Sequence, residues 1–205
     1  MTATTFAEAQ AWIVSVGRWL DGKGWAPATS GNYSARLDDG SFAVTVSGRH
    51  KGRLTPDDVM RVDAAGASLD GKKPSAETAL HLALYTLFPE CGAVLHSHSA
   101  ANVGLSRAAY AGSYSFAGHE MLKALPGNPT HDASVAIPIV DNSQDMAVIE
   151  AAIAPRLLAP GAAPAYLIRG HGLYGWGKDM AEAERVIEAV EWMIAAELAE
   201  RSFRG

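Results

Sequence analysis

Three histidines in this sequence have the spacing to hold one metal ion. His96 and His98 are separated by one residue at the end of the apolar run 93–95. On a β-strand, residues i and i+2 point to the same face with Cα atoms about 6.6 Å apart, so two imidazoles can reach one ion. His171 lies between two glycines, where an uncrowded backbone can present a third imidazole. Three histidines with an open fourth position form the ligand set of a catalytic zinc site.

Each pattern also has an ordinary structural explanation. Two histidines at a strand end can be satisfied by hydrogen bonds alone, and glycines on both sides of a residue are typical of a turn. The two patterns together favour a metal site held by histidines. Cys91 is the only cysteine, which excludes a cysteine-rich zinc site. We expect His50, His81 and His131 to be surface or locally hydrogen-bonded residues.

The composition excludes several other classes of protein. The 205 residues carry a formal net charge of -5 and contain no contiguous basic block, which argues against a nucleic acid partner. One cysteine cannot form an intramolecular disulfide, which favours a reducing, cytoplasmic location. The sequence has no apolar run of about 18 residues that could cross a bilayer, and its N-terminus lacks a signal-peptide pattern. We therefore expect a cytoplasmic globular protein with no membrane partner.

The histidines must be positioned by a series of strands and helices. Apolar spacing and capping residues predict helices over residues 5–21, 75–88, 99–107, 143–157 and from 179 onward. Strands are predicted over residues 32–37, 42–47, 60–63, 93–98, 134–140, 165–169 and 173–176. Pro138, inside one of these runs, predicts an edge strand.

The order of these elements predicts the fold class. Hairpins near the N-terminus, followed by helices and strands in alternation, favour an α/β sandwich with a mixed or largely antiparallel sheet. No linker rich in proline, glycine or serine divides the chain, and no repeat is present. We expect a single domain over residues 1–205.

Six segments of the chain resemble the class II aldolase and adducin family. They are residues 30–36, 47–52, 74–78, 96–99, 119–121 and 169–174. The first, second and fourth segments occur in looser form across the family. The full run of residues 47–52, as it stands here, and residues 118–121 are more particular to a dehydratase branch. The resemblance runs nearly end to end. It implies a class II aldolase-like, three-layer sandwich with helices on both faces of the sheet, assembled as a homotetramer.

The resemblance also implies a binding site for a sugar phosphate. By position, the phosphate would be held by amide, hydroxyl and backbone donors at Asn32, Ser47, Gly48 and Ser75, with Lys51 as the nearest cation. A local nest of N–H groups and a cation allow an acidic protein to bind a phosphate. Without the resemblance, Asn32 and Ser47 would be read as ordinary turn and strand-end residues.

The metal ligands and two glutamates carry the implied chemistry. The resemblance implies one zinc ion per subunit at His96, His98 and His171. Glu120 matches the acid/base of the dehydratase branch and is our first prediction for that role, while Glu77 matches an aldolase glutamate that approaches the metal and is predicted as a helper. Read alone, Glu77 would favour the positive end of a helix, and Glu120 would be a solvated residue.

The implied reaction is zinc-dependent dehydration of 5-methylthioribulose 1-phosphate to 2,3-diketo-5-methylthiopentyl 1-phosphate, a step of methionine salvage. The C2 carbonyl makes the C3 proton acidic, a metal can stabilise the resulting enediolate, and the C4 hydroxyl leaves as water. A class II aldolase or epimerase acting on a fuculose or pentulose phosphate would use a related enediolate, so the metal ligands do not separate the two. A non-catalytic scaffold like the adducin head domain is a third possibility, which the complete histidine set disfavours.

Overall fold

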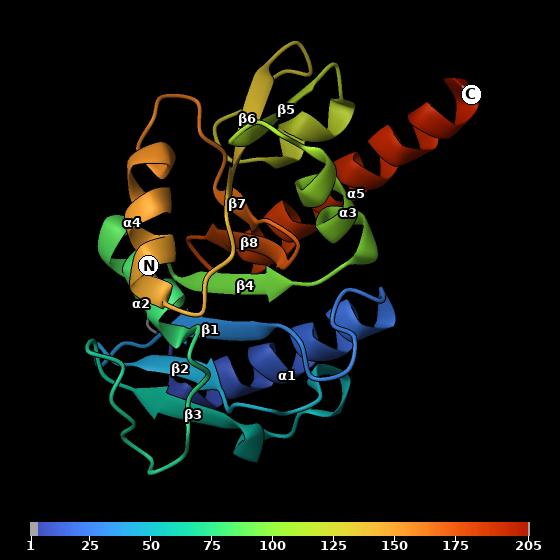
Figure 1. Ribbon diagram of the computed structural model, residues 1–205. Coiled ribbons are helices and arrows are strands. Elements are labelled where there is room, and N and C mark those ends of the chain that lie inside the picture. The colour runs from blue at the N-terminus through green and yellow to red at the C-terminus, as the bar shows by residue number, and fades with distance from the viewer. Residues whose placement is uncertain (1–3, 205) are drawn as a thin grey trace.

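A mixed sheet of eight strands forms the centre of the computed structural model, which describes residues 4–204 (Figure 1). The strands are β1 (Asn32–Arg36), β2 (Phe42–Thr45), β3 (Val59–Val62), β4 (Ala93–Ser97), β5 (Ser113–Ala117), β6 (Ser134–Val140), β7 (Ala165–Ile168) and β8 (Gly172–Gly177). Their order in the sheet is β3-β2-β1-β4-β8-β7-β6-β5. Only β6 and β7 pair in parallel. Residues 1–3 and 205 of the predicted domain lie outside the described residues.

Helices cover both faces of this sheet. On one face lie α1 (Phe6–Gly22), α3 (Ala100–Ala108) and α5 (Met180–Arg204), and on the other lie α2 (Thr78–Leu87) and α4 (Met146–Leu157). Short 3-10 helices span Lys51–Arg53, Pro56–Asp58 and Glu120–Ala124. Each face has its own cluster of buried apolar side chains. The predicted three-layer α/β sandwich with a largely antiparallel sheet is confirmed.

Side chains alternate along β4, the strand that carries His96, so its two faces contact different helices. Val94 belongs to the apolar cluster under α2 and α4, whereas Leu95 belongs to the cluster under α1, α3 and α5. Since side chains alternate along a strand, His96 points to the α2 side and Ser97 to the α5 side. The strand therefore presents a histidine to one layer and a hydroxyl to the other.

A glycine allows β8 to lie close against this strand. A Cβ atom added at Gly172 would lie 2.3 Å from the carbonyl oxygen of Ser97 and 2.7 Å from Cε1 of His96. Such distances are shorter than any real Cβ contact, so no side chain fits there without movement of the backbone. Gly172, predicted only as part of a turn, thus brings the His171 loop up to β4.

The predicted edge position of β6 is wrong, because β5 pairs with it and forms the edge of the sheet. The Ile139 N–H donates to the carbonyl of Gly112 at 2.8 Å, so the neighbouring Pro138–Ser113 pair exchanges no backbone hydrogen bonds. On the other side of β6, pairing with β7 begins only at Ile139. An isolated parallel bridge joins Ala136 to Ala162 on that side, so Pro138, which lacks an N–H, lies where the pairing is interrupted.

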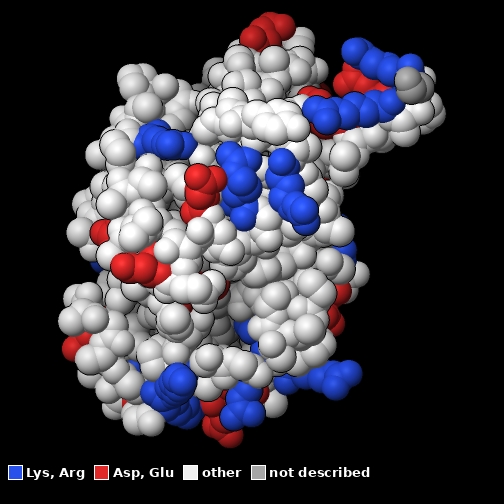
Figure 2. Space-filling view, in the orientation of Figure 1, with Lys and Arg blue, Asp and Glu red and all other residues white. Residues whose placement is uncertain are grey.

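Charged side chains of both signs lie on the surface. Figure 2 shows lysine and arginine side chains interspersed with aspartate and glutamate over the face in view. Among residues 4–204, none of the helices combines the length and the apolar character needed to span a membrane.

Candidate active site

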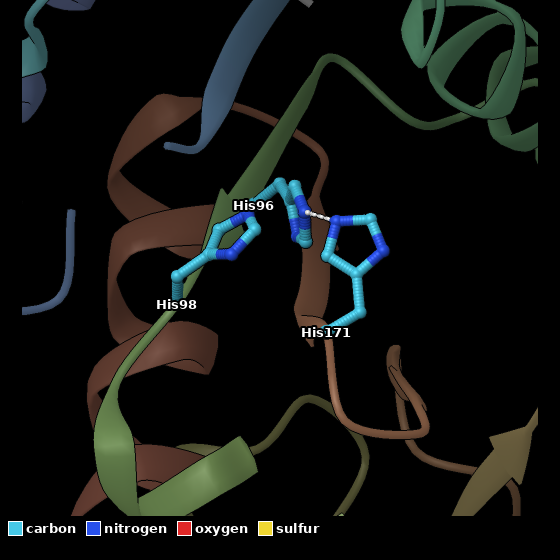
Figure 3. A group of neighbouring side chains, drawn as sticks. All are labelled: His96, His98 and His171. Atoms are coloured by element: carbon cyan, nitrogen blue, oxygen red, sulfur yellow. Dashed lines mark hydrogen bonds between the residues drawn. The ribbon is translucent and has the colours of Figure 1, made fainter. Parts of the chain in front are cut away.

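The three predicted metal ligands converge in space. His96 lies near the end of β4, His98 directly follows the strand, and His171 lies in the turn between β7 and β8. One ligand atom from each ring lies within 4.8 Å of the others. Figure 3 shows the three rings facing one another, with Nε2 of His96 and Nε2 of His171 only 3.4 Å apart.

Two of the rings are oriented by hydrogen bonds at their far nitrogens. Nδ1 of His96 lies 3.0 Å from the carbonyl oxygen of Leu173. Because a carbonyl can only accept a hydrogen bond, Nδ1 must be the donor. The ring of His96 also stacks on Tyr174, with centroids 3.9 Å apart. Nδ1 of His171 lies 3.2 Å from Oδ1 of Asn142. Donation at Nδ1 leaves a lone pair on Nε2 of His96, the arrangement found in metal-binding histidines, whereas Nε2 of His171 faces the carboxylate of Glu77.

The donor set fits a divalent metal. The two Nε2 atoms of His96 and His171 lie 3.4 Å apart, a separation that a proton or a cation between them stabilises. Two nitrogens bound to one tetrahedral zinc at about 2.0–2.1 Å would be about 3.3–3.4 Å apart. Burial also lowers the pKa of His96 well below its usual value and that of His98 to about 4. Both rings are therefore neutral at pH 7, as metal ligands must be.

Glu77 lies directly beside this triad, at the N-terminal end of α2. Its Oε1 is 2.9 Å from Nε2 of His171 and its Oε2 is 3.6 Å from Nε2 of His96. Burial alone would raise the pKa of Glu77, but the hydrogen bond to His171, the two neighbouring histidines and a hydrogen bond from Asn32 together hold it well below its usual value. The carboxylate is thus kept ionised next to the metal ligands.

A chain of buried hydrogen bonds connects Glu77 to strand β1 and helix α2. Asn32 donates from Nδ2 to Glu77, and its Oδ1 faces Nε2 of His81. On the other side of that ring, Nδ1 lies 2.7 Å from the hydroxyl of Ser34, which lies 2.8 Å from the hydroxyl of Tyr85. Burial lowers the pKa of His81 to about 4, so the ring is neutral. The only consistent tautomer donates from Nε2 to Asn32 and accepts from Ser34 at Nδ1.

The sequence patterns do not predict this role of His81. They indicate a surface or locally hydrogen-bonded residue, yet His81 is 1% exposed and bonds to strand β1 across nearly fifty positions of chain. A usable signal is its place on the apolar face of the helical pattern, between Leu80 and Leu84.

The five residues predicted to bind phosphate line a single cavity of about 280 Å³. Glu77 and His98 line the same cavity, so one metal ligand, the carboxylate and the polar donors share one space. Gly48 has a φ of +75°, a conformation that side chains rarely adopt. The residues that line the cavity are Thr29, Ser30, Gly31, Asn32, Thr45, Val46, Ser47, Gly48, Lys51, Ser75, Glu77 and His98.

Lys51 is the cation of this cavity, and it is almost fully buried. Its Nζ donates to the carbonyls of Thr29 at 2.8 Å and Arg49 at 2.6 Å, which leaves one of its three N–H donors for another partner. Burial lowers the pKa of Lys51 to about 8, an effect that the charge of Glu77 partly offsets. The two carbonyls thus orient the ammonium group beside the neutral donors that line the cavity.

Glu120 lies elsewhere in the structure. It begins the 3-10 helix 120–124, its side chain is 72% exposed, and it does not line the cavity. Its Oε1 accepts from Nζ of Lys123 at 2.5 Å, and its Oε2 is 3.7 Å from Nδ1 of His131. The hydrogen bond from Lys123 lowers the pKa of Glu120. Within one chain, the structure brings Glu77 and not Glu120 to the histidines.

Comparison with known proteins gives one family and a set of close relatives. The family described as "Class II Aldolase and Adducin N-terminal domain" matches residues 11–198. A protein of Methylococcus capsulatus named methylthioribulose-1-phosphate dehydratase is 50% identical over 197 residues, which are 96% of each chain. A protein of the same name from Azotobacter vinelandii is 50% identical over 194 residues, 94% of each chain.

Solved structures show the same fold. L-fuculose-1-phosphate aldolase from Thermus thermophilus superimposes with a TM-score of 0.78 at 26% identity, over 98% of this chain and 99% of the other. A sugar-phosphate aldolase from Thermotoga maritima superimposes with a TM-score of 0.71 at 20% identity, over 96% of each chain. The second likeness supports the fold alone.

Proposed function

The chain belongs to the class II aldolase and adducin family, and from this premise we propose that it dehydrates 5-methylthioribulose 1-phosphate to 2,3-diketo-5-methylthiopentyl 1-phosphate in methionine salvage. The observation that carries the proposal is the shared cavity, in which a histidine triad and an ionised carboxylate adjoin a set of neutral donors and one lysine. Relatives with half of their residues identical over nearly the whole chain carry the name of this hydro-lyase.

The cofactor in this proposal is one zinc ion per subunit, held by His96, His98 and His171. When bound, such an ion supplies Lewis acidity to a carbonyl or hydroxyl oxygen of the substrate. The support for a metal is the convergence of three imidazoles, two of which have a hydrogen-bond partner at Nδ1. Imidazole ligands also suit iron, cobalt and manganese, so metal analysis of protein purified without added metal decides the native ion.

The phosphate group of the substrate is proposed to bind to the polar residues of the cavity. Asn32, Ser47, Gly48, Lys51 and Ser75 are proposed to bind the phosphate, since neutral donors and one ammonium group can hold an anion without a surplus of positive surface charge. Their position in one cavity supports this assignment. The phosphate would fix the sugar so that its C3 lies toward the histidines.

A glutamate is proposed to move the proton. It removes the proton from C3 and then returns a proton to the C4 hydroxyl, which leaves as water, and the enol that remains ketonises to the diketone. The family motif favours Glu120 for this step, and the position of Glu77 beside the triad supports a role for that residue as well. For Glu120 to act, the segment 118–124 must bring its carboxylate to the cavity.

One assay tests the proposed reaction. Purified, metal-loaded protein is mixed with 5-methylthioribulose 1-phosphate, and we expect loss of water and formation of the diketone. His98→Ala and His171→Ala variants are the controls and should lose both metal and turnover. A wild-type protein that holds metal but leaves this substrate unchanged would rule out the proposed function.

A sugar-phosphate aldolase or epimerase is the second candidate function. Glu77 matches the aldolase glutamate of the family and lies in the cavity, and the fold is shared with an L-fuculose-1-phosphate aldolase at 26% identity. An aldolase would break the C3–C4 bond and release dihydroxyacetone phosphate together with an aldehyde. Detection of those products in the same assay, in place of the diketone, would favour this candidate.

We also propose that residues 1–205 form a single domain and that the protein is a cytoplasmic homotetramer. One sheet contains strands from residue 32 to residue 177, which supports the single domain. The only cysteine, Cys91, is buried with a free thiol, which suits a reducing compartment. The tetramer is supported by the family resemblance and by apolar side chains exposed on α5.

A further inference from the structure

A buried carboxylate lies on the face of β4 opposite to His96. Glu191 lies within α5 and is 2% exposed. Its Oε1 accepts hydrogen bonds from the hydroxyl of Ser97 at 2.7 Å and from Nδ2 of Asn102 at 2.8 Å. Its Oε2 accepts from the hydroxyl of Ser99 at 2.6 Å. One side chain of α5 thus bonds to the end of β4 and to the first turn of α3.

The place of Glu191 in the helix is costly for a charge. Its neighbours on the inner face of α5, including Val190 and Ile194, are buried apolar residues. Among residues 4–204, no lysine, arginine or histidine forms an ion pair with it. A buried charge without a counter-ion persists only when hydrogen bonds replace its water, as three donors do here. An apolar residue would pack α5 without this cost.

The three histidines differ in how their rings are held. His96 and His171 each have a hydrogen-bond partner at Nδ1, Leu173 and Asn142 respectively. Within the described part of the chain, neither ring nitrogen of His98 has such a partner, and His98 is fixed through its backbone N–H, which donates to Trp25 at 2.7 Å. The direction of the His98 ring therefore depends on the backbone around it.

The residues bonded to Glu191 are the ones that define that backbone. Ser97 precedes His98 and Ser99 follows it, and each hydroxyl donates to a different oxygen of the same carboxylate. Ser99 is also the N-cap of α3, where its hydroxyl oxygen accepts from the N–H of Asn102 at 2.9 Å. The carboxylate thus holds the chain on both sides of His98 at the point where a strand becomes a helix.

From this arrangement we infer that Glu191 is a positioning residue of the metal site, which sets the direction of His98 by holding Ser97 and Ser99. The inference rests on the proposed role of His98 as a metal ligand. It extends that role to a residue of α5, nearly a hundred positions away in sequence and without contact with the metal cavity.

Metal affinity of the Glu191→Gln variant tests the inference, because the amide keeps the volume and removes one acceptor oxygen. Competition with a chelator should show Zn²⁺ and Co²⁺ binding about 10–100-fold weaker than in the wild type, the range seen when the partners of metal ligands are changed. The visible absorption bands of the Co²⁺-loaded protein should shift, since they report ligand geometry. Glu188→Gln, an exposed glutamate on the same helix, is the matched control and should leave both readouts unchanged.

A second variant guards against poor folding of the first. Ser97→Ala removes one donor and keeps the carboxylate, and it should weaken metal binding in the same direction by a smaller factor. If both variants bind metal as the wild type does, with unchanged Co²⁺ bands and only a lower melting temperature, Glu191 merely docks the helix and the inference is wrong. A wild-type protein that binds no metal would instead overturn the proposed metal site, and this inference with it.

Discussion

Glu77 and Glu120 have opposite surroundings, and a pair of variants can tell their roles apart. Glu77 is held ionised beside the histidines, whereas Glu120 is exposed and bonds to Lys123. If Glu120 is the acid/base, Glu120→Gln keeps its metal and loses about 10²–10⁴-fold in kcat, the usual contribution of a positioned proton-transfer group. Metal content and steady-state kinetics measure both effects, with Glu188→Gln as the control. Retention of most of the rate by Glu120→Gln, with its loss in Glu77→Gln, would assign the step to Glu77.

The hydrogen bonds behind Glu77 explain why Asn32 faces it with an amide group and not with an oxygen. The carbonyl oxygen of Asn32 is occupied by the Nε2–H of His81, so the amide nitrogen must face Glu77. The donation from Asn32 is one of the interactions that keep the Glu77 carboxylate ionised. The polar character of the cavity is thus determined by residues as remote from it as Tyr85.

At the level of elements, the close approach of β8 to β4 should be sensitive to a single methyl group. Gly172→Ala places a Cβ 2.3 Å from the carbonyl of Ser97, so β8 must move. We expect a loss of about 1–3 kcal/mol in the free energy of unfolding together with weaker metal binding. Urea unfolding and metal titration measure these effects.

The control for this prediction is a glycine with open space. Gly104 lies in α3 with no atom within 4 Å of an added Cβ. Gly104→Ala should therefore gain about 0.5–1 kcal/mol, as expected in a helix interior. A Gly172→Ala variant as stable as the wild type would show that the two strands separate without cost.

Sequence patterns predict the helices and strands better than the strand pairing and the long-range hydrogen bonds that join them. Local periodicity and caps place the five α-helices of residues 4–204 to within a few residues, and the first of them begins with a capping box of Thr5 and Glu8. Periodicity does not reveal β5 or the inner position of β6, because strand pairing is decided by distant segments. Glu191 could not be singled out either, since its partners lie about ninety positions earlier.

At the scale of the whole molecule, α5 carries apolar surface that one chain does not cover. Trp192, Leu198 and Phe203 are exposed on this helix, whose C-terminal half extends from the body of the protein (Figure 1). We expect a tetramer, with a mass by light scattering about four times the 21.5 kDa of one chain. Leu198→Glu should dissociate it, since burial of a charge in an interface is costly. A wild-type protein with the mass of one chain would contradict the expected assembly.

Acid should destabilise the metal-free protein through its buried neutral histidines. Burial lowers the pKa of His81 from 6.5 to about 4, so the unfolded chain binds a proton before the folded protein does as the pH falls. The stability contributed by this neutral ring is complete above pH 6.5 and is lost between pH 6.5 and 4, at most about 1.4 kcal/mol per pH unit and about 3 kcal/mol in total. His98, with a similarly lowered pKa, acts in the same direction.

The buried acid Glu191 has the opposite effect on the pH dependence of stability, so the direction in which the free energy of unfolding changes is informative. Burial raises the pKa of Glu191, so the folded protein gains stability as that carboxyl takes up its proton. The three histidines with lowered pKa values, His81, His96 and His98, still outweigh this acid. The free energy of unfolding in urea, measured from pH 7.5 to 4 with chelator present, should therefore fall. His81→Phe should flatten the slope by about one proton. It also lowers the stability at every pH, because Oδ1 of Asn32 loses its donor and the hydroxyl of Ser34 loses its acceptor. A slope unchanged in that variant would show that His81 is not held neutral by the fold.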